Sequence, residues 1–410
     1  MPTRSPPSDR ANPVHGLNGG HGASAFVRER DPGADTAGAP WQPVAAPLKG
    51  RGTAWALQHR FSRTQHEAVD DGWGDPAADG MAGSEVLPPQ TTVIEERVKS
   101  IIAANDSPDI SFDLSINPYR GCEHGCIYCF ARPTHSYLNL SPGLDFETRL
   151  IAKVNAADRL REALARPSYV PKVINIGSAT DAYQPVERRL RITRSVIEVL
   201  VAHRHPFSII TKSAGVERDL DLIAPMAEAR QCAVYLSITT LDPALARILE
   251  PRAASPQRRL QTVRTLSQAG VPVGVSVSPL IPFLNEPELE RVLEAAAGAG
   301  ACRGFSIPLR LPWEVNPLFQ QWLETHFPDR AARVMARVRD MRGGKDYDAT
   351  FGTRMTGQGV WADLMQQRVR KAVVRFGLSD DKGRHALDTS PFCRPAPVAR
   401  DTDGPQLALF

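Results

Sequence analysis

From Val93 to about Leu309, short runs of apolar and β-branched residues alternate with longer amphipathic segments. The short runs predict strands, and segments with apolar residues three and four positions apart predict helices. The predicted strands are 111–117, 173–177, 207–211, 233–239, 273–277 and 304–308. The predicted helices between them are 146–166, 187–203, 216–229, 255–269 and 286–298.

This alternation predicts an α/β protein. Crossovers of this length allow parallel pairing with right-handed connections and helices on both faces of the sheet. Six β/α units predict a partial TIM-like (β/α)6 barrel, although an open doubly wound sheet would show the same local pattern. In either fold, functional residues gather where the strands end and the following loops begin.

The segments on either side of the barrel differ in composition. Residues 1–92 are rich in Gly, Pro, Ala, Asp and Arg, which predicts a mostly disordered N-terminal extension, with 55–61 as a possible docking strap. Residues 93–312 form the predicted barrel. Residues 313–410 hold C-terminal helices and a Pro-rich tail, and we expect these helices to cap the barrel or close its opening; they are 318–326, 330–341 and 361–376.

The net charge of +4 is mild and leaves a nucleic-acid substrate open. No apolar run is long enough to span a bilayer, so we expect a cytoplasmic protein without membrane contact. Six cysteines in 410 residues are too few for a disulfide scaffold, and three of them fall within eight positions. This clustering indicates metal chemistry in a reducing compartment.

Cys122, Cys126 and Cys129 directly follow the first predicted strand, and Gly121 and Gly125 would let the backbone wrap tightly. Thiolates are the soft ligands that iron-sulfur clusters need. A cubane has four irons, so three cysteines would leave one iron open. The same cysteines with His124 or His135 could instead hold a structural zinc ion. The spacing alone leaves both interpretations open.

With its strand context, Cys122-x-x-x-Cys126-x-Tyr128-Cys129 resembles the signature of the radical S-adenosylmethionine (SAM) superfamily. Within that superfamily the chain is similar to the spore photoproduct lyase-related group, also described as DNA repair photolyase-like. The similarity covers about residues 101–311. The motifs that carry it are NPYRGC at 117–122, FARPTH at 130–135, GSATDAYQPVE at 177–187, TKS at 211–213 and EPR at 250–252.

The resemblance implies a lyase-like radical SAM enzyme whose 93–312 domain is the radical SAM barrel. It implies a [4Fe-4S] cluster on the three cysteines, with S-adenosyl-L-methionine bound at the open iron. Reductive cleavage of SAM would give a 5′-deoxyadenosyl radical that abstracts hydrogen from an unidentified substrate, with nucleic acid among the candidates. It also implies a reducing partner such as flavodoxin or ferredoxin.

Five residues correspond to SAM contacts in the family. Thr180 and Asp181 would accept from the methionine amino group, although an Asp there also suits a helix N-cap. Lys212 would pair with the methionine carboxylate, unless it is a surface lysine. Ser237 would donate to the same carboxylate, and Tyr128 would lie near adenine. Packing alone could also explain these last two.

The chain departs from spore photoproduct lyase at one position. That enzyme uses a further cysteine as a hydrogen donor, where this chain has Ser178 and Ala179. Cys302 or Cys393 could replace it only if the fold brings either one to the mouth of the barrel. The alternatives to a radical enzyme are a zinc-bearing nucleic-acid-binding module and a cluster protein that only relays electrons.

Overall fold

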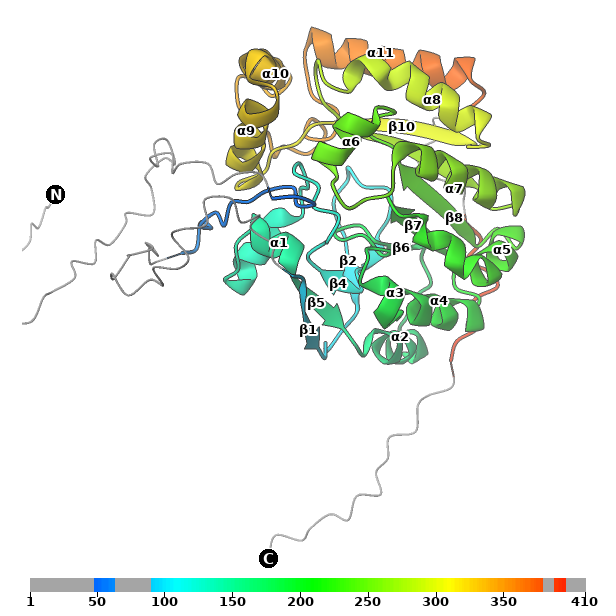
Figure 1. Ribbon diagram of the computed structural model, residues 1–410. Coiled ribbons are helices and arrows are strands. Elements are labelled where there is room, and N and C mark those ends of the chain that lie inside the picture. The colour runs from blue at the N-terminus through cyan, green and yellow to red at the C-terminus, as the bar shows by residue number, and fades with distance from the viewer. Residues whose placement is uncertain (1–47, 63–89, 379–386, 396–410) are drawn as a thin grey trace, which may run out of the picture. The chain divides into compact units, whose positions relative to one another are not determined.

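The computed structural model of the protein describes residues 48–62, 90–378 and 387–395 (Figure 1). The main sheet has seven strands in the order β10-β9-β8-β7-β6-β3-β2. The neighbours from β3 to β10 are parallel, and the edge strand β2 is antiparallel to β3. These strands are β2 (Ile102–Ala104), β3 (Leu114–Ile116), β6 (Ile174–Ile176), β7 (Phe207–Thr211), β8 (Cys232–Ser237), β9 (Val273–Leu280) and β10 (Arg303–Pro308).

The six parallel strands are those predicted from the sequence, and the partial (β/α)6 barrel is confirmed. Helices follow the strands in the expected alternation. They are α2 (Ala156–Ala165), α3 (Glu187–Leu190), α4 (Ile192–Ala202), η2 (Ala214–Asp219), α5 (Leu220–Glu228), α6 (Pro243–Leu249), α7 (Pro256–Gln268), η3 (Glu286–Glu288) and α8 (Leu289–Gly298).

The start of α7 shows why the local pattern was informative. Ser255 is the N-cap and its hydroxyl accepts a hydrogen bond from the backbone N–H of Arg258 at 3.3 Å. Pro256 occupies the first helical position, where its missing N–H costs nothing. Gly270, with φ of 78°, follows the end of the helix.

The prediction of one helix over 146–166 is wrong. The segment begins in α1 (Leu144–Thr148), continues as strand β5 (Arg149–Lys153) and becomes helical again in α2. β5 is the middle strand of a second sheet, between β1 (Thr92–Glu96) and β4 (Tyr119–Arg120). Pairing on both sides therefore overrides the helical pattern. The predicted helix 187–203 is also interrupted, because Arg191 adopts φ of 52° between α3 and α4.

The described residues form two large apolar clusters. The larger one fills the space between the main sheet and its outer helices, with Val234, Val275 and Leu293 each fully buried. The second packs the inner faces of α9 (Val315–His326) and α10 (Pro328–Asp340) against the cysteine loop, through residues such as Phe319 and Ile127. The C-terminal helices therefore support the loop directly.

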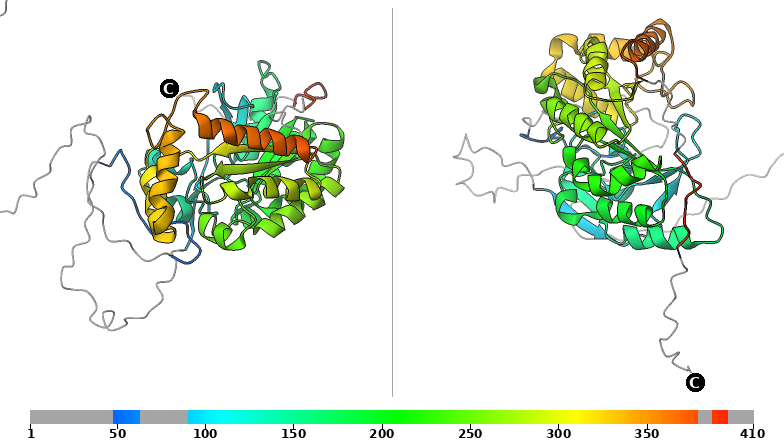
Figure 2. Two further views of the ribbon diagram at one scale, coloured as in Figure 1. Left: turned by 90° about the horizontal axis from the view of Figure 1, so that it is seen from above. Right: turned by 90° about the vertical axis from the view of Figure 1, so that its right-hand side faces the viewer.

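The last helix, α11 (Val360–Arg375), runs along α8 beside the edge strand β10 (Figure 2). Arg368 of α11 forms ion pairs with Glu286 and Glu290. In this way α11 covers the open edge of the parallel sheet. Among the helices of the described ranges, none combines the length and apolar character that crossing a bilayer requires.

Candidate active site

The three clustered cysteines lie in the loop between β4 and η1 (Arg132–Leu138), beyond the carboxyl end of β3. Cys122 and Cys126 are buried, Cys129 is partly exposed, and none is in a disulfide. The loop turns at Gly121 and Gly125, whose φ values of 78° and 67° are in the left-handed region. Only glycine adopts this region without steric cost, which explains the residue choice between the thiols.

The thiols suit the ligand chemistry of an iron-sulfur cluster. Burial raises the pKa of Cys126 to about 12 and that of Cys122 well above its usual range. Without a metal both sulfurs keep their protons, and a metal binds by displacing them. In residues 48–62, 90–378 and 387–395, no three His, Cys, Asp or Glu side chains converge as they would on one metal ion. Three closely spaced thiols are nevertheless the donor set that such clusters use.

Arg132 holds the cysteine loop from within the protein. Its side chain is 0% exposed, and it donates to the carbonyl oxygens of Gly125 at 3.2 Å and Cys126 at 2.9 Å. It also donates to both carbonyl oxygens of the 142–143 turn and pairs with buried Glu147 at 2.5 Å. Burial raises the pKa of Glu147, although Arg132 opposes the shift. The shape of the loop therefore depends on one buried ion pair.

Residues 48–62, here called the strap, lie against this loop (blue in Figure 1). The backbone N–H of Gly52 donates to the Glu147 carboxylate at 2.8 Å. A Cβ on Gly52 would lie only 1.8 Å from the carbonyl oxygen of Gly125, so the two backbones touch. The sequence suggested a strap at 55–61, and the contact with the loop begins slightly earlier.

The far end of the strap is fixed by Arg60. One guanidinium nitrogen of Arg60 donates to both carboxylate oxygens of Glu314, at 2.9 and 2.7 Å, at the entry to α9. The guanidinium also lies 4.6, 5.3 and 4.5 Å from the ring centres of Phe61, Tyr137 and Trp313. The strap thus joins the cysteine loop to the C-terminal helices.

Glu250 connects the cysteine loop with the segment after β8 and with helix α7. Its carboxylate accepts hydrogen bonds from Tyr128 and from Thr239, the latter at 2.6 Å, and pairs with buried Arg259. Burial opposes ionisation of Glu250, but Arg259 and Lys212 lower its pKa to about 2. Glu250 is therefore ionised, and Tyr128 is fixed between two of the cysteines by its hydroxyl.

Lys212 directly follows β7 and faces the same region. Its ammonium lies 5.9 Å from the centre of the Tyr128 ring. Burial lowers the pKa of Lys212, but Cys126 in its thiolate form and the Glu250 carboxylate outweigh this effect and the net shift is upward. Within the described part of the chain, no acidic side chain comes within 4.0 Å of this ammonium. A charged lysine without a carboxylate partner thus lies beside the thiols.

The carboxylate of Asp181 already has more partners within the protein than the sequence indicated. One oxygen accepts from Tyr183 N at 2.9 Å and Thr211 Oγ1 at 2.7 Å. The other accepts from Lys212 N at 2.7 Å and lies 3.3 Å from Nδ1 of His124. Burial opposes ionisation, but His124 and these hydrogen bonds hold the pKa well below its usual range. Asp181 therefore ties the cysteine loop to the end of β7.

The two remaining predicted SAM contacts, Thr180 and Ser237, differ in whether their hydroxyls already form hydrogen bonds. Thr180 is buried, and its hydroxyl donates to the carbonyl oxygen of Gly121 at 2.8 Å. Ser237 ends β8 opposite Ser276 of β9, and its hydroxyl has no hydrogen-bond partner among the described residues. Ser237 is therefore a free donor at a strand end, whereas Thr180 already supports the loop.

No cysteine replaces the hydrogen donor of spore photoproduct lyase at this mouth. Ser178 and Ala179 are held by the side chain of Asn117, at 3.2 and 2.8 Å. The backbone N–H of Cys302 donates to Val273 O, at the amino end of β9 and thus opposite the mouth. Cys393 is exposed and contacts His203 after α4. Neither thiol reaches the strand ends that carry the candidate site.

The sequence did not identify the residues that hold other site residues in position. Arg132 belongs to the FARPTH motif, which gives no role for it. Its partner Glu147 falls in the predicted helix 146–166, and nothing in that pattern marks it as an ion-pair partner. The EPR motif places Glu250 next to Arg252, but the partner of Glu250 is Arg259. The adjacent spacing Glu-Pro-Arg gave no signal for this pairing.

The comparisons agree with this geometry. The Radical SAM superfamily model matches residues 116–296. An uncharacterised protein of Mycobacterium tuberculosis is 38% identical over 312 residues, which cover 75% of this chain and 84% of the relative. An uncharacterised protein of Methanocaldococcus jannaschii is 30% identical over 173 residues, covering 42% of this chain and 62% of the relative.

A similar solved structure is that of spore photoproduct lyase complexed with dinucleoside spore photoproduct. It has a TM-score of 0.50 and 16% identity, over 70% of this chain and 81% of that one. This likeness concerns the fold. The chain belongs to the Radical SAM superfamily, as its motifs predicted, and is an enzyme of that class. Its fold is similar to that of spore photoproduct lyase, and nothing in the comparisons favours a zinc module.

Proposed function

We propose that Cys122, Cys126 and Cys129 hold a [4Fe-4S] cluster that reductively cleaves S-adenosylmethionine. When bound, the cluster and SAM supply a 5′-deoxyadenosyl radical that abstracts hydrogen from the substrate. The observation that carries this proposal is the charged Lys212 beside three clustered thiols, with no acidic partner in the described ranges. A carboxylate from a ligand would complete that pair.

The chain's own residues divide into ligand contacts and positioning residues. Lys212 would pair with the methionine carboxylate and Ser237 would donate a hydrogen bond to it. Tyr128 would place its ring against adenine, held by its bond to Glu250. Thr180 and Asp181 remain candidates for the methionine amino group. Because both are already hydrogen-bonded, their effect on SAM would come largely from positioning the loop and Lys212.

The substrate class we propose is a nucleic acid. This rests on the similarity of the fold to that of spore photoproduct lyase, whose solved structure is complexed with dinucleoside spore photoproduct. Apart from the three clustered cysteines, no cysteine of the described residues lies at the mouth beside Ser178. This argues for a different lesion or reaction, since a serine O–H is too strong to donate a hydrogen atom readily. A reductant such as flavodoxin or ferredoxin would supply the electron, and a cluster of this kind suits the cytoplasm.

The test is anaerobic reconstitution with iron and sulfide, followed by dithionite and SAM. We expect about four irons per chain, a broad iron-sulfur absorbance and formation of 5′-deoxyadenosine. C126S should lose iron and product, whereas C393S, which changes an exposed thiol outside the loop, should retain both. Bound zinc without iron would support the zinc-bearing module. A cluster that never cleaves SAM would indicate an electron relay.

A further inference from the structure

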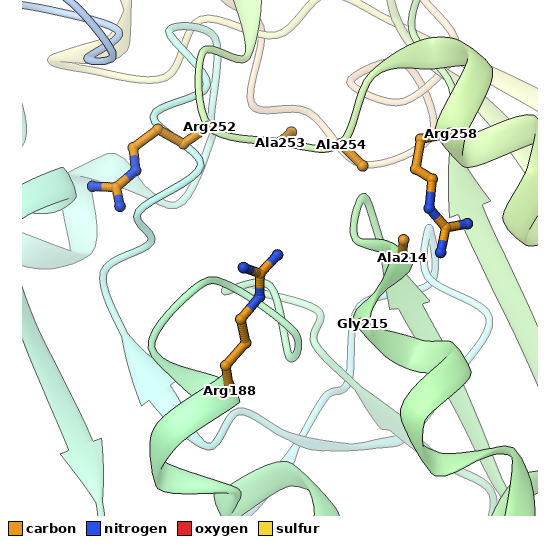
Figure 3. Close-up of a pocket in the computed structure, with 7 residues that line it drawn as sticks. All are labelled: Arg188, Ala214, Gly215, Arg252, Ala253, Ala254 and Arg258. Carbon is orange, nitrogen blue, oxygen red and sulfur yellow. The ribbon is translucent and has the colours of Figure 1, made fainter.

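A cavity of about 400 Å³ opens on the rim of the barrel, close to the cysteine loop (Figure 3). Three arginines from separate segments line it: Arg188 of α3, Arg252 after α6, and Arg258 in the first turns of α7. Arg188 reaches into the middle of the space, with the other two on opposite sides. The remaining lining residues are small and leave the backbone accessible: Ala214, Gly215, Ala253 and Ala254.

The three arginines differ in how far their charge is compensated. Arg258 forms a bidentate pair with Glu217 at 2.6 and 2.7 Å. Arg252 lies 3.2 Å from Glu123 of the cysteine loop. Arg188 is exposed, and no acidic group of the described residues comes within 4.0 Å of its guanidinium. The cavity therefore carries a net positive charge, centred on Arg188.

The walls of the cavity favour an anion with several oxygens. The start of α7, a 13-residue helix capped by Ser255, adds a partial positive charge beside Arg258. Guanidinium groups donate in pairs to tetrahedral oxyanions, and the Arg188 guanidinium points into this space, with Arg252 and Arg258 at its two sides. A phosphate group matches this arrangement in charge and in number of acceptors.

We propose that this cavity binds a phosphate group, with Arg188 as its principal ligand and Arg252 and Arg258 beside it. None of its lining residues is among those proposed to contact SAM. The phosphate could belong to the backbone of a nucleic acid or to a phosphorylated small molecule. In either case it would anchor the ligand at the rim next to the cysteine loop.

The matched variants are R188Q and R189Q, which remove one charge each from neighbouring exposed positions of α3. Of these two arginines, only Arg188 lines the cavity. Binding of a fluorescent single-stranded oligonucleotide is measured by anisotropy on the anaerobically reconstituted protein, without SAM. Inorganic phosphate and a phosphomonoester, ribose 5-phosphate, are tested as competitors and as direct ligands by calorimetry.

We expect R188Q to weaken phosphate-dependent binding by about 10-fold or more, and R189Q by less than about 3-fold. For the oligonucleotide, loss of one phosphate contact should also reduce the slope of log K against log salt by about 0.7. Oligonucleotide binding that inorganic phosphate displaces would assign a nucleic-acid backbone. Binding of the phosphomonoester alone would assign a small phosphorylated ligand.

Two results would overturn the site. One is equal loss in R188Q and R189Q, which would mean general surface charge. The other is no binding of the oligonucleotide, inorganic phosphate or ribose 5-phosphate at millimolar concentration. Because the readout needs no SAM cleavage, failure to form 5′-deoxyadenosine would refute the proposed function and leave the phosphate result standing.

Discussion

Replacing Arg132 by methionine should destabilise the protein more than any change of an exposed arginine. The substitution keeps an unbranched apolar stem but removes every hydrogen bond of the guanidinium, including those to Gly125 O and Cys126 O. It also leaves Glu147 buried, at 0% exposure, without its cation. Four carbonyl oxygens and the Glu147 carboxylate therefore lose the guanidinium at once.

The magnitude follows from the environment of the pair. Breaking a buried ion pair from one side costs about 3–5 kcal/mol, because the remaining charge stays desolvated. This is a large part of the roughly 5–15 kcal/mol that holds most domains together. The double variant R132M/E147L removes both charges. It should be about 2 kcal/mol more stable than R132M, although it also loses the bond from Gly52 N.

Urea unfolding under anaerobic conditions would measure both variants, with iron content after reconstitution as a second readout. R161M is the matched control, because the Arg161–Asp158 pair is 49% and 65% exposed and should contribute less than about 1 kcal/mol. If R132M loses no more free energy of unfolding than R161M and binds a full complement of iron, the ion pair does not hold the loop. If the loss of stability in the double variant equals the sum of the losses in R132M and E147L, the two residues are not coupled.

Three further changes test other parts of the structure. In the strap, G52A places a Cβ against Gly125 O and should cost about 1–3 kcal/mol of stability in urea unfolding. The control G298A, where the added Cβ meets nothing, should be neutral or stabilising. Equal stability of the two variants would contradict the packing of the strap. At the site, K212Q should weaken SAM binding, measured by calorimetry, by about 10-fold or more, and an unchanged affinity would remove Lys212 from the contact set. Burial lowers the pKa of His205 from 6.5 to about 4, so the unfolded chain binds a proton that the fold excludes. Stability should therefore fall by about 2 kcal/mol more in the wild type than in H205Q between pH 7.5 and pH 5, and equal losses would contradict the neutral imidazole.

The sequence predicted those features that depend on local pattern. Runs such as 207–211 are apolar and β-branched, so the parallel strands could be located to within a few residues. The spacing of Cys122, Cys126 and Cys129 is also local and marked the loop directly. β5 was missed because its pairing with β1 and β4 outweighs a short amphipathic pattern that continues into α2.

The supporting residues could not be predicted in the same way. Arg132 and Glu147 are 15 positions apart, on elements whose packing no periodicity reveals. Asp181 was predicted to contact SAM, but three hydrogen-bond donors and the His124 ring already surround it. A sequence shows that an acidic residue is available at a position; only the fold shows how many partners it has there.

The strap has a consequence for how the protein is assembled. Gly52 meets Glu147 across 95 positions, whereas Arg132 reaches the same carboxylate across 15. Closing the longer loop costs about 1.6 kcal/mol more conformational entropy, so the strap should dock after the cysteine loop has formed. Iron must then reach the cysteines before the docked strap slows its access to the loop. A chain without the strap should therefore load iron faster and lose it faster than the complete chain.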